Sequence, residues 1–271
     1  MHKQITSIHN SYIKELVQLK EKSRSRKKTQ TFLIEGLREI TLAIEGNYTI
    51  ETILAATSII NTEEIEKLLN SVNYPIEVIE ISNEVYQKLA LRESTEGILA
   101  IAKSKDLSLK SIKFKNKNPL ILIAEAPEKP GNIGALLRTA DAAGLDAVLI
   151  ANPKTDIYNP NIIRSSIGCV FTTQIATGTT SEILSFLKEH HINLYAAALT
   201  ASVEYQTINY TEPTAIIVGT EATGLTNDWL QNTSKNIIIP MRGAIDSMNV
   251  SVSAAIILFE AIRQRQLIID N

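Results

Sequence analysis

Residues 118–151 read NPLILIAEAPEKPGNIGALLRTADAAGLDAVLIA and indicate how the second half of the chain folds. Two apolar runs flank a polar loop and a segment with the spacing of a helix. Short apolar runs bounded by turn residues are typical of buried strands, and the total length fits one strand, helix and strand. The stretch therefore predicts a βαβ unit within a mostly parallel sheet that is covered by helices on both faces.

The rest of the second half continues this alternation. Further strands are predicted near residues 169–176, 193–199, 214–219 and 236–239, and helices near residues 159–166, 181–190 and 249–265. Residues 119–271 are therefore predicted to form one α/β domain. In such sheets a ligand binds beyond the carboxyl ends of the strands.

The first half alternates in the same way. The predicted elements are helices at 11–20, 62–71 and 83–90, strands at 50–56, 76–81 and 97–102, and a strand that turns into a helix within 32–46. We interpret residues 1–105 as a small α/β sandwich. Residues 106–118 are rich in Lys and Ser, and we expect them to form a linker with few packing contacts.

The composition is that of a globular protein. The 271 residues are 44% hydrophobic and 21% charged, and no long low-complexity segment occurs. Cys169 is the single cysteine, so an intramolecular disulfide and a cysteine-rich metal site are both excluded. No apolar run of about 18 residues and no signal-like N-terminus is present. We expect a cytoplasmic protein without a membrane segment.

The charge is unevenly distributed, although the formal net charge is only -2. Residues 1–28 carry eight basic and two acidic side chains, a net charge of +6, which leaves -8 for the remaining 243 residues. A basic segment of this kind can neutralise nucleic-acid phosphates. A solvated helix end has the same composition, and charge alone does not separate the two interpretations.

Three polar loops follow predicted strands. They are EAPEKPGNIGALLRTADAAG (125–144), IIVGTEATGLTNDWL (216–230) and IIIPMRGAIDSMNVSVSAAI (237–256). Taken singly, each loop has a purely structural explanation as a turn followed by a helix cap. Because all three should leave the same edge of one sheet, together they predict a binding site.

Arg138 is the least ordinary residue of the first loop. It lies between Leu137 and Ala140 on a helix that we expect to be largely buried, where a guanidinium needs an anionic partner. The structural alternative is an ion pair with Glu125 or Asp141.

Common nucleotide and zinc motifs are missing. No G-x-G-x-x-G follows a strand, and neither G-x-x-x-x-G-K-[ST] nor H-E-x-x-H occurs. This counts against dinucleotide binding, nucleotide hydrolysis and zinc hydrolysis. His190 and His191 end a predicted helix, and we interpret them as C-terminal capping residues.

The three loops together resemble the SpoU (TrmH-like) RNA ribose 2′-O-methyltransferases of the SPOUT superfamily. The matching segments are PGNIGALLRTADAAG, IIVGTEATGL and IPMRGAIDSMNVSVSAAI, and in the first half ITSIHNSYIKELVQL, FLIEGLREI and STEGILAIA, so that nearly the whole chain is covered. The resemblance implies an α/β trefoil-knot methyltransferase domain at 119–271, a linker at 106–118 and an RNA substrate-binding domain at 1–105. It also implies S-adenosylmethionine as cofactor, no metal, and a homodimer.

The resemblance implies roles for individual residues. The implied catalytic residues are Asn132, Arg138, Glu221, Ser247 and Asn249. The implied cofactor-binding residues are Val218, Gly219, Thr220, Glu221, Gly224, Ile239, Met241, Ser247, Met248, Asn249 and Ser251. Two positions depart from the pattern, because many relatives have Asn where this chain has Thr220 and Asp where it has Glu125.

The implied reaction transfers a methyl group to a ribose 2′-hydroxyl, which requires RNA. We expect Arg24, Arg26, Lys27, Lys28 and Arg164 to contact RNA phosphates, and ribosomal RNA to be a better substrate class than transfer RNA. Three alternatives stay open: a transfer RNA 2′-O-methyltransferase, a catalytically silent RNA-binding or ribosome-assembly protein, and an unrelated α/β enzyme acting on a small molecule.

Overall fold

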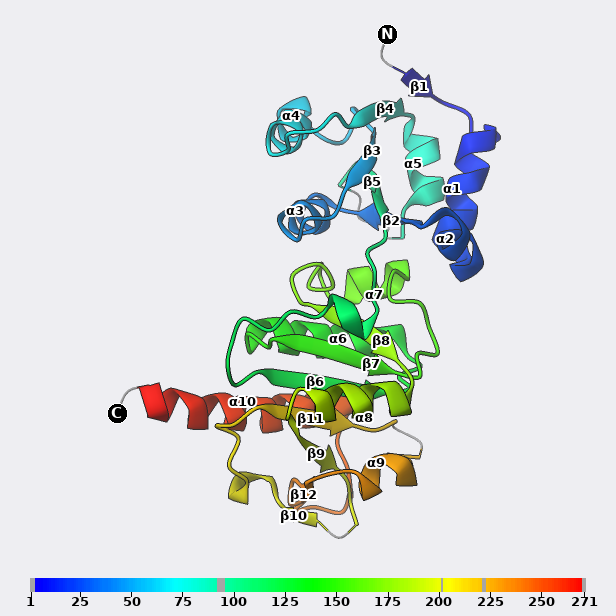
Figure 1. The fold of residues 1–271 in the computed structure, drawn as a ribbon. Coiled ribbons are helices and arrows are strands. Elements are labelled where there is room, and N and C mark those ends of the chain that lie inside the picture. The colour runs from blue at the N-terminus through cyan, green and yellow to red at the C-terminus, as the bar shows by residue number, and fades with distance from the viewer. Residues whose placement is uncertain (1–2, 92–95, 201, 221–222, 270–271) are drawn as a thin grey trace. The chain divides into compact units, whose positions relative to one another are not determined.

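A computed structural model describes residues 3–91, 96–200, 202–220 and 223–269. The chain forms two compact units, each with its own sheet (Figure 1). The first unit comprises Met1–Lys105 and Asp156–Thr172, and the second comprises Asp106–Thr155 and Thr173–Asn271.

The first unit is built on a five-stranded mixed sheet in the order β1-β4-β3-β5-β2. Its strands are β1 (Lys3–Ile5), β2 (Thr31–Glu35), β3 (Ile50–Ala55), β4 (Glu77–Ile81) and β5 (Ile98–Lys103). Strand β5 runs antiparallel to β2 and β3, whereas β4 runs parallel to β1 and β3. The parallel pair β3 and β4 is joined through a helix, as parallel strands require.

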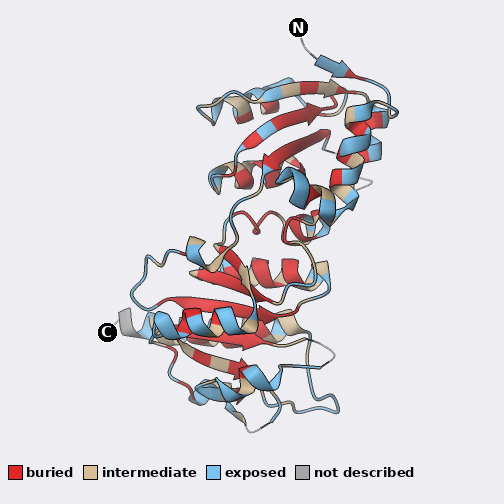
Figure 2. Ribbon diagram, turned by 45° about the vertical axis from the view of Figure 1, so that its right-hand side comes forward, coloured by how far each residue is buried: buried red, intermediate tan, exposed pale blue. Residues whose placement is uncertain are grey.

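Helices cover both faces of this sheet. They are α1 (Ser11–Glu21), α2 (Ser23–Thr29), α3 (Leu37–Glu45), α4 (Thr62–Asn70) and α5 (Asn83–Leu89). Ile13 of α1 and Tyr86 of α5 are fully buried in one cluster with Leu54 of the sheet. Figure 1 shows α3 and α4 on the opposite face, and Figure 2 shows the buried residues along the strands. The predicted α/β sandwich is confirmed.

Part of the first unit comes from the middle of the second half of the sequence. Residues Asp156–Thr172, which include α7 (Pro160–Ser165), pack beside β2. Tyr158 stacks on Phe32 with ring centroids 4.3 Å apart, and Phe171 meets Tyr48 at 5.0 Å. This aromatic cluster buries the hydroxyl of Tyr48 and raises its pKa above the usual range.

The second unit is built on a seven-stranded sheet in the order β10-β12-β9-β11-β6-β7-β8, with every pair parallel. Its strands are β6 (Leu120–Glu125), β7 (Ala147–Ala151), β8 (Ile175–Gly178), β9 (Asn193–Ala197), β10 (Ser202–Glu204), β11 (Thr214–Val218) and β12 (Lys235–Ile238). All residues of β6, β7 and β11 are buried. This explains their continuous apolar sequences and confirms the predicted parallel sheet.

Four helices cover the second sheet: α6 (Pro130–Ala142), α8 (Thr180–Glu189), α9 (Asn227–Gln231) and α10 (Val250–Ile269). Helices α6 and α10 pack against each other. Phe186 of α8 and Trp229 of α9 belong to one core cluster with Ile121 and Ile217. Because neighbouring residues of a strand point to opposite faces, this cluster occupies one face of the sheet.

Two sequence predictions are wrong here. The strand expected near 169–176 begins only at Ile175, because the chain turns at Gly168, where φ is +89° and a Cβ would collide with Leu42. The segment 106–118 was expected to make few contacts, yet Leu109, Ile112 and Phe114 pack on the core of the second unit. Its apolar residues are few, but they all face inward.

Candidate active site

The carboxyl ends of three neighbouring strands of the second unit surround a cavity of about 830 Å³. Its walls come from residues 197–200 after β9, residues 218–220 and 223–225 after β11, residues 237–239 at the end of β12, and residues 246–250 before and at the start of α10. Pockets for small ligands have volumes of roughly 300–1,000 Å³. The cavity therefore lies at the predicted edge of the sheet and has the size of a cofactor site.

Two glycines shape the loop after β11. Thr220 and Gly224 exchange backbone hydrogen bonds of 3.1 Å in both directions, which closes the loop on itself. A Cβ at Gly219 would collide with the backbone of Gly224, and Gly224 itself has φ +67°. Both positions therefore require glycine, and the loop leaves its backbone beside the cavity.

The structure gathers most of the predicted cofactor residues around this cavity. Those that line it are Val218, Gly219, Thr220, Gly224, Ile239, Met241, Ser247, Met248 and Asn249. Ser251 does not line it; its backbone N–H and its hydroxyl donate to Asn249 Oδ1 at 2.9 and 2.6 Å, which caps the start of α10. Glu221 lies outside the described residues.

Three of the predicted catalytic residues, Asn132, Ser247 and Asn249, lie at or just before the starts of α6 and α10. Asn249 Nδ2 donates to Asn132 Oδ1 at 3.4 Å, which joins the start of α6 to the start of α10. Ser247, two residues before Asn249, is exposed, and its hydroxyl donates to the Asp246 carboxylate at 3.0 Å. The arrangement places hydroxyl and amide groups at one rim of the cavity.

Arg138 is exposed, which corrects the expected burial. Helix α6 buries Ile133, Leu136, Leu137 and Ala140, and the residue after Leu137 falls outside this stripe because successive helix positions are about 100° apart. Among the described residues no ion pair or hydrogen bond of Arg138 occurs. The guanidinium is therefore accessible to an anionic ligand.

Glu125 does not pair with Arg138 but serves a different network. Its carboxylate is 5% exposed and accepts hydrogen bonds from Trp229 Nε1 at 2.8 Å and from Asn152 Nδ2 at 3.0 Å. Asn152 Nδ2 also lies 2.8 Å from Thr180 Oγ1. The network joins the ends of β6 and β7 to α9, which follows the glycine loop.

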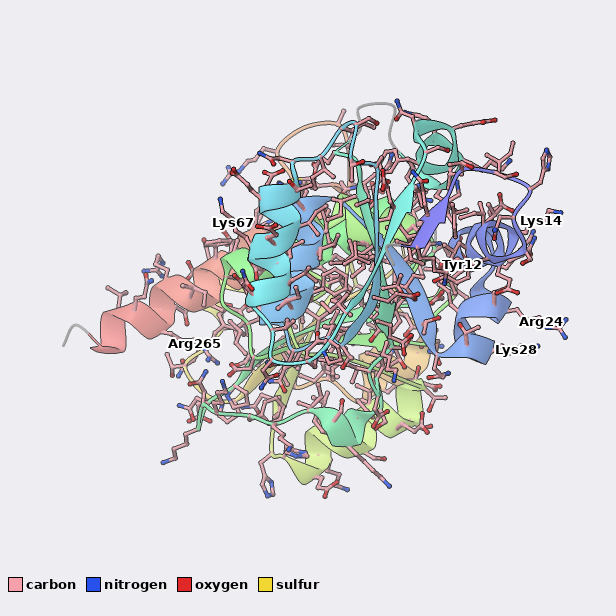
Figure 3. The ribbon with its side chains drawn as sticks, turned by 90° about the horizontal axis from the view of Figure 1, so that it is seen from above. Tyr12, Lys14, Arg24, Lys28, Lys67 and Arg265 are labelled. Atoms are coloured by element: carbon pink, nitrogen blue, oxygen red, sulfur yellow. The ribbon has the colours of Figure 1, made fainter. Side chains whose placement is uncertain are left out.

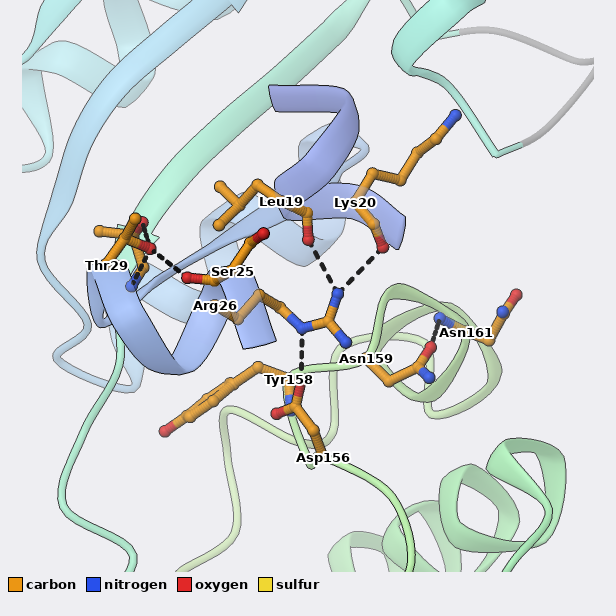
Figure 4. A network of polar contacts seen from close by, with 10 residues as sticks. Leu19, Lys20, Ser25, Arg26, Thr29, Asp156, Tyr158, Asn159 and Asn161 are labelled. Carbon is orange, nitrogen blue, oxygen red and sulfur yellow. Dashed lines mark hydrogen bonds and ion pairs between the residues drawn. The ribbon is translucent and has the colours of Figure 1, made fainter. Parts of the chain in front are cut away.

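The residues expected to bind RNA divide into two groups. Arg24, Lys27 and Lys28 of α2 and Arg164 of α7 are exposed. Arg26 is 4% exposed, which contradicts its prediction as an RNA contact. Its Nε is ion-paired with Asp156, and its Nη1 donates to the carbonyls of Leu19 at 2.8 Å and Lys20 at 3.0 Å (Figure 4).

Exposed cations of α1 and α2 lie on one side of the first unit, as Lys14, Arg24 and Lys28 show. Figure 3 shows Lys14, Arg24 and Lys28 projecting on that side, with Lys67 of α4 on the opposite side. Among the described residues no ion pair joins Lys14, Arg24 or Lys28 to a carboxylate. We call Lys14, Lys22, Arg24, Lys27 and Lys28 the basic face.

Sequence reasoning missed one wall of the cavity. Ala197, Ala198, Leu199 and Thr200 line it after β9, and Leu199 is 61% exposed. No unusual polar residue marks this wall, but the rule that ligands bind at the carboxyl ends of parallel strands applied to β9 as well.

Among the described residues, every helix is too short or too polar to span a membrane. No group of three or more His, Cys, Asp and Glu residues in this part of the chain could hold a metal ion.

These features define an α/β protein with a cofactor-sized cavity at the strand ends of a parallel sheet. The family model described as SpoU rRNA Methylase matches residues 119–259, and the model described as MRM3-like substrate binding domain matches residues 10–100. The chain belongs to the SpoU rRNA methylase family.

Several relatives are similar over different lengths. The 23S rRNA (guanosine(2553)-2′-O)-methyltransferase RlmP of Bacillus subtilis is 30% identical and covers 95% of this chain and 98% of its own. The tRNA (guanosine(18)-2′-O)-methyltransferase of Escherichia coli is 37% identical but covers only 54% of this chain and 64% of its own. The crystal structure of the SpoU methyltransferase AviRb from Streptomyces viridochromogenes in complex with AdoMet has a TM-score of 0.87 at 26% identity, covering 95% of this chain and 99% of that one.

Proposed function

We propose that this protein transfers a methyl group from S-adenosylmethionine to a ribose 2′-hydroxyl of ribosomal RNA. The observation that carries the proposal is the cavity itself, because its lining joins the glycine loop after β11 to the segment before α10, both of which belong to the matched family region. Family membership and the cofactor-bound relative support S-adenosylmethionine as the cofactor.

The residues present fit this cofactor. The backbone of Gly219 lines the cavity and would offer hydrogen-bonding groups, and the loop is held beside it by the backbone bonds between Thr220 and Gly224. Met248, Ile237 and Ile257 provide apolar surface for an adenine ring. When bound, S-adenosylmethionine supplies a methyl group activated by its sulfonium.

Arg138 is the principal group on the substrate side. A guanidinium is not deprotonated in proteins, so Arg138 is not the general base. Instead it holds a phosphate of the target nucleotide in a bidentate contact and stabilises the alkoxide that develops at the 2′-oxygen. The proton passes to a phosphate oxygen, to Glu221 or to water. Asn132 and Asn249, held together at 3.4 Å, orient the hydroxyl at the rim.

The basic face and Arg164, both in the first unit, contact the RNA backbone in this proposal. The basic face offers five exposed cations, and phosphate contacts of this kind position an RNA without reading its sequence. Arg26 has no part in this contact, because its donors are used inside the unit.

A homodimer and the predicted trefoil knot belong to the same proposal. Val252 and Phe259 of α10 are 47% and 48% exposed and lie seven residues apart, on one side of the helix. This apolar stripe supports a second copy of the chain as its cover. Residues 237–252 are proposed as the knotted segment, and the cytoplasm as the compartment of the enzyme.

Ribosomal RNA is preferred over transfer RNA because of how much of the chain each relative covers. The ribosomal enzyme RlmP matches both units, whereas the transfer RNA enzyme matches only about half of the chain. A substrate-binding unit shared with an enzyme of ribosomal RNA favours the same substrate class.

The test is a tritiated-methyl transfer assay with ribosomal and transfer RNA from a strain that lacks the gene. We expect label in ribosomal RNA that is abolished in Arg138→Ala. Label in transfer RNA alone would make transfer RNA, and not ribosomal RNA, the substrate class. Cofactor binding without label in either pool would favour the silent RNA-binding protein, and no cofactor binding would contradict the proposed methyl transfer.

A further inference from the structure

Residues 107–118 lie along β8, the edge strand of the second sheet, with a fixed backbone. Thr177 of β8 donates its N–H to the carbonyl of Leu107 at 2.7 Å. The side chain of Gln174 brackets Lys113, since it accepts from the Lys113 N–H at 3.0 Å and donates to the Lys113 carbonyl at 3.0 Å. The segment is therefore an ordered cover of the sheet edge.

The side chains of this segment are sorted by direction. Ile112 is buried in the core cluster, and Leu109 and Phe114 pack against it. Four lysines interleaved with these anchors are exposed: Lys110, Lys113, Lys115 and Lys117. We call these four residues the lysine strip.

The positive charge of the strip is not neutralised within the second unit. Among the described residues, none of its four ammonium groups forms an ion pair. The neighbouring carboxylates are used by neutral donors, because Ser108 donates twice to Asp106, at 2.9 and 2.7 Å, and Asn116 donates to Asp146 at 2.6 Å. The two hydrogen bonds from Ser108 lower the pKa of Asp106.

The strip also stands out against the charge of its unit. The second unit has twelve basic and fourteen acidic side chains, a net charge of -2, and without the strip its net charge would be -6. Four like charges on one rigid segment repel one another. A polyanion or solvent ions lower the cost of this repulsion.

We propose that the lysine strip is a second RNA-binding surface, which holds the phosphate backbone of the substrate on the catalytic unit. The proposal rests on the proposed function, since the polyanion is the RNA substrate. Lysine is a point charge without a planar fork, and Phe114 is turned inward. The strip therefore recognises the backbone and neither stacks on bases nor reads their sequence.

The experiment measures RNA binding at several salt concentrations with the full chain and protein-free, unmodified 23S ribosomal RNA as the probe. The variant replaces all four strip lysines with Gln. Each phosphate contact contributes about 0.7 to the slope of log K against log salt for single-stranded RNA, so we expect the slope to become shallower by about 3. Lys235→Gln is the matched control, because Lys235 is an exposed lysine of β12, far from β8 in the strand order. Its slope should not change.

The outcomes separate this proposal from the proposed function. An unchanged slope in a folded strip variant that still methylates RNA would contradict RNA binding by the lysine strip, and it would not affect the proposed methyltransferase function. An unchanged slope together with concentration-dependent aggregation would assign the lysines to protection of the sheet edge, and would also overturn the proposal. Absence of methyl transfer in the unmodified protein contradicts the proposed function, whereas the binding slopes still report on the strip.

Discussion

Polar side chains are buried in one region of the molecule and exposed in another. The first region is the segment 156–172 of the first unit with the residues it contacts, and the second is the rim of the cavity in the second unit. In the first region, the Arg26 and Asp156 side chains are 3% and 10% exposed and are paired with each other. At the rim, Ser247 and Asn249 are exposed, and Arg138 on α6 is exposed as well. A buried charge is stable only with its partners in place, whereas an exposed one is accessible to a ligand. In this chain the buried cation Arg26 holds the fold, whereas the exposed cation Arg138 is accessible to a ligand.

The largest effect is expected when the buried cation Arg26 is removed. Arg26→Ala leaves the Asp156 carboxylate and two carbonyls without their donor, so we expect the free energy of unfolding to fall by about 3–5 kcal/mol. Urea denaturation followed by circular dichroism measures it. Arg24→Ala, on the same helix but exposed, should change stability by less than about 0.5 kcal/mol. Equal stability of the two variants would contradict the structural role of Arg26.

Removing the exposed cation Arg138 should lower the activity and leave the stability unchanged. We expect Arg138→Ala to lower kcat/KM for methyl transfer by about 10²–10³-fold, because charge stabilisation at the developing alkoxide is lost. The thermal midpoint should stay unchanged, since the side chain is exposed. Steady-state kinetics and a thermal melt on the same samples check both.

Arg138→Lys tests whether the planar guanidinium is needed in addition to the positive charge. Lysine keeps the charge but loses the planar fork, so it should recover only a small part of the activity. Near-normal turnover in this variant would contradict a bidentate phosphate contact.

The two arginines also mark the limit of sequence reasoning. Periodicity predicted most of the helices and strands, because most of them bury an apolar stripe or an apolar run; it did not predict β1, α2, β10 and α9, which are short. Burial of a single charged residue depends on which segment packs against it, and for Arg26 that segment, with Asp156, is 130 residues away. No local pattern carries this information. The same holds for Gly168, whose positive φ turns the chain beside Leu42 of the first unit.

The residues of the cavity were more predictable from the sequence than the packing of residues 156–172 in the first unit. Nine of the residues implied by the family resemblance line one cavity, because they follow strands that end at one edge. The wall after β9 was missed since Ala197 and Leu199 have no chemical signature. Motifs find the residues that do chemistry, whereas the sheet alone determines which neutral residues complete the cavity.

Glu125→Gln tests a residue that shares features of both regions, since it is buried but adjoins the cavity loops. An amide offers one acceptor oxygen to Trp229 and Asn152 and brings donors of its own, so one buried group loses its partner at a cost of about 1–3 kcal/mol. We expect about tenfold weaker binding of S-adenosylmethionine by calorimetry, because α9 follows the glycine loop. Trp229 is the single tryptophan, so its fluorescence should shift as well. Glu128→Gln, in the exposed part of the same loop, should change neither quantity.

The smallest effect is expected from one exposed cation of the basic face. Arg24→Ala removes about one phosphate contact, so the slope of log K against log salt for ribosomal RNA should become shallower by about 0.7, with stability and cofactor binding unchanged. The matched control is Lys67→Ala, an exposed lysine on the opposite side of the same unit (Figure 3). Equal slopes for the two variants would mean that the basic face is only solvated. A change confined to Arg24→Ala would show that, two residues apart on one helix, Arg24 serves RNA binding and Arg26 serves the fold.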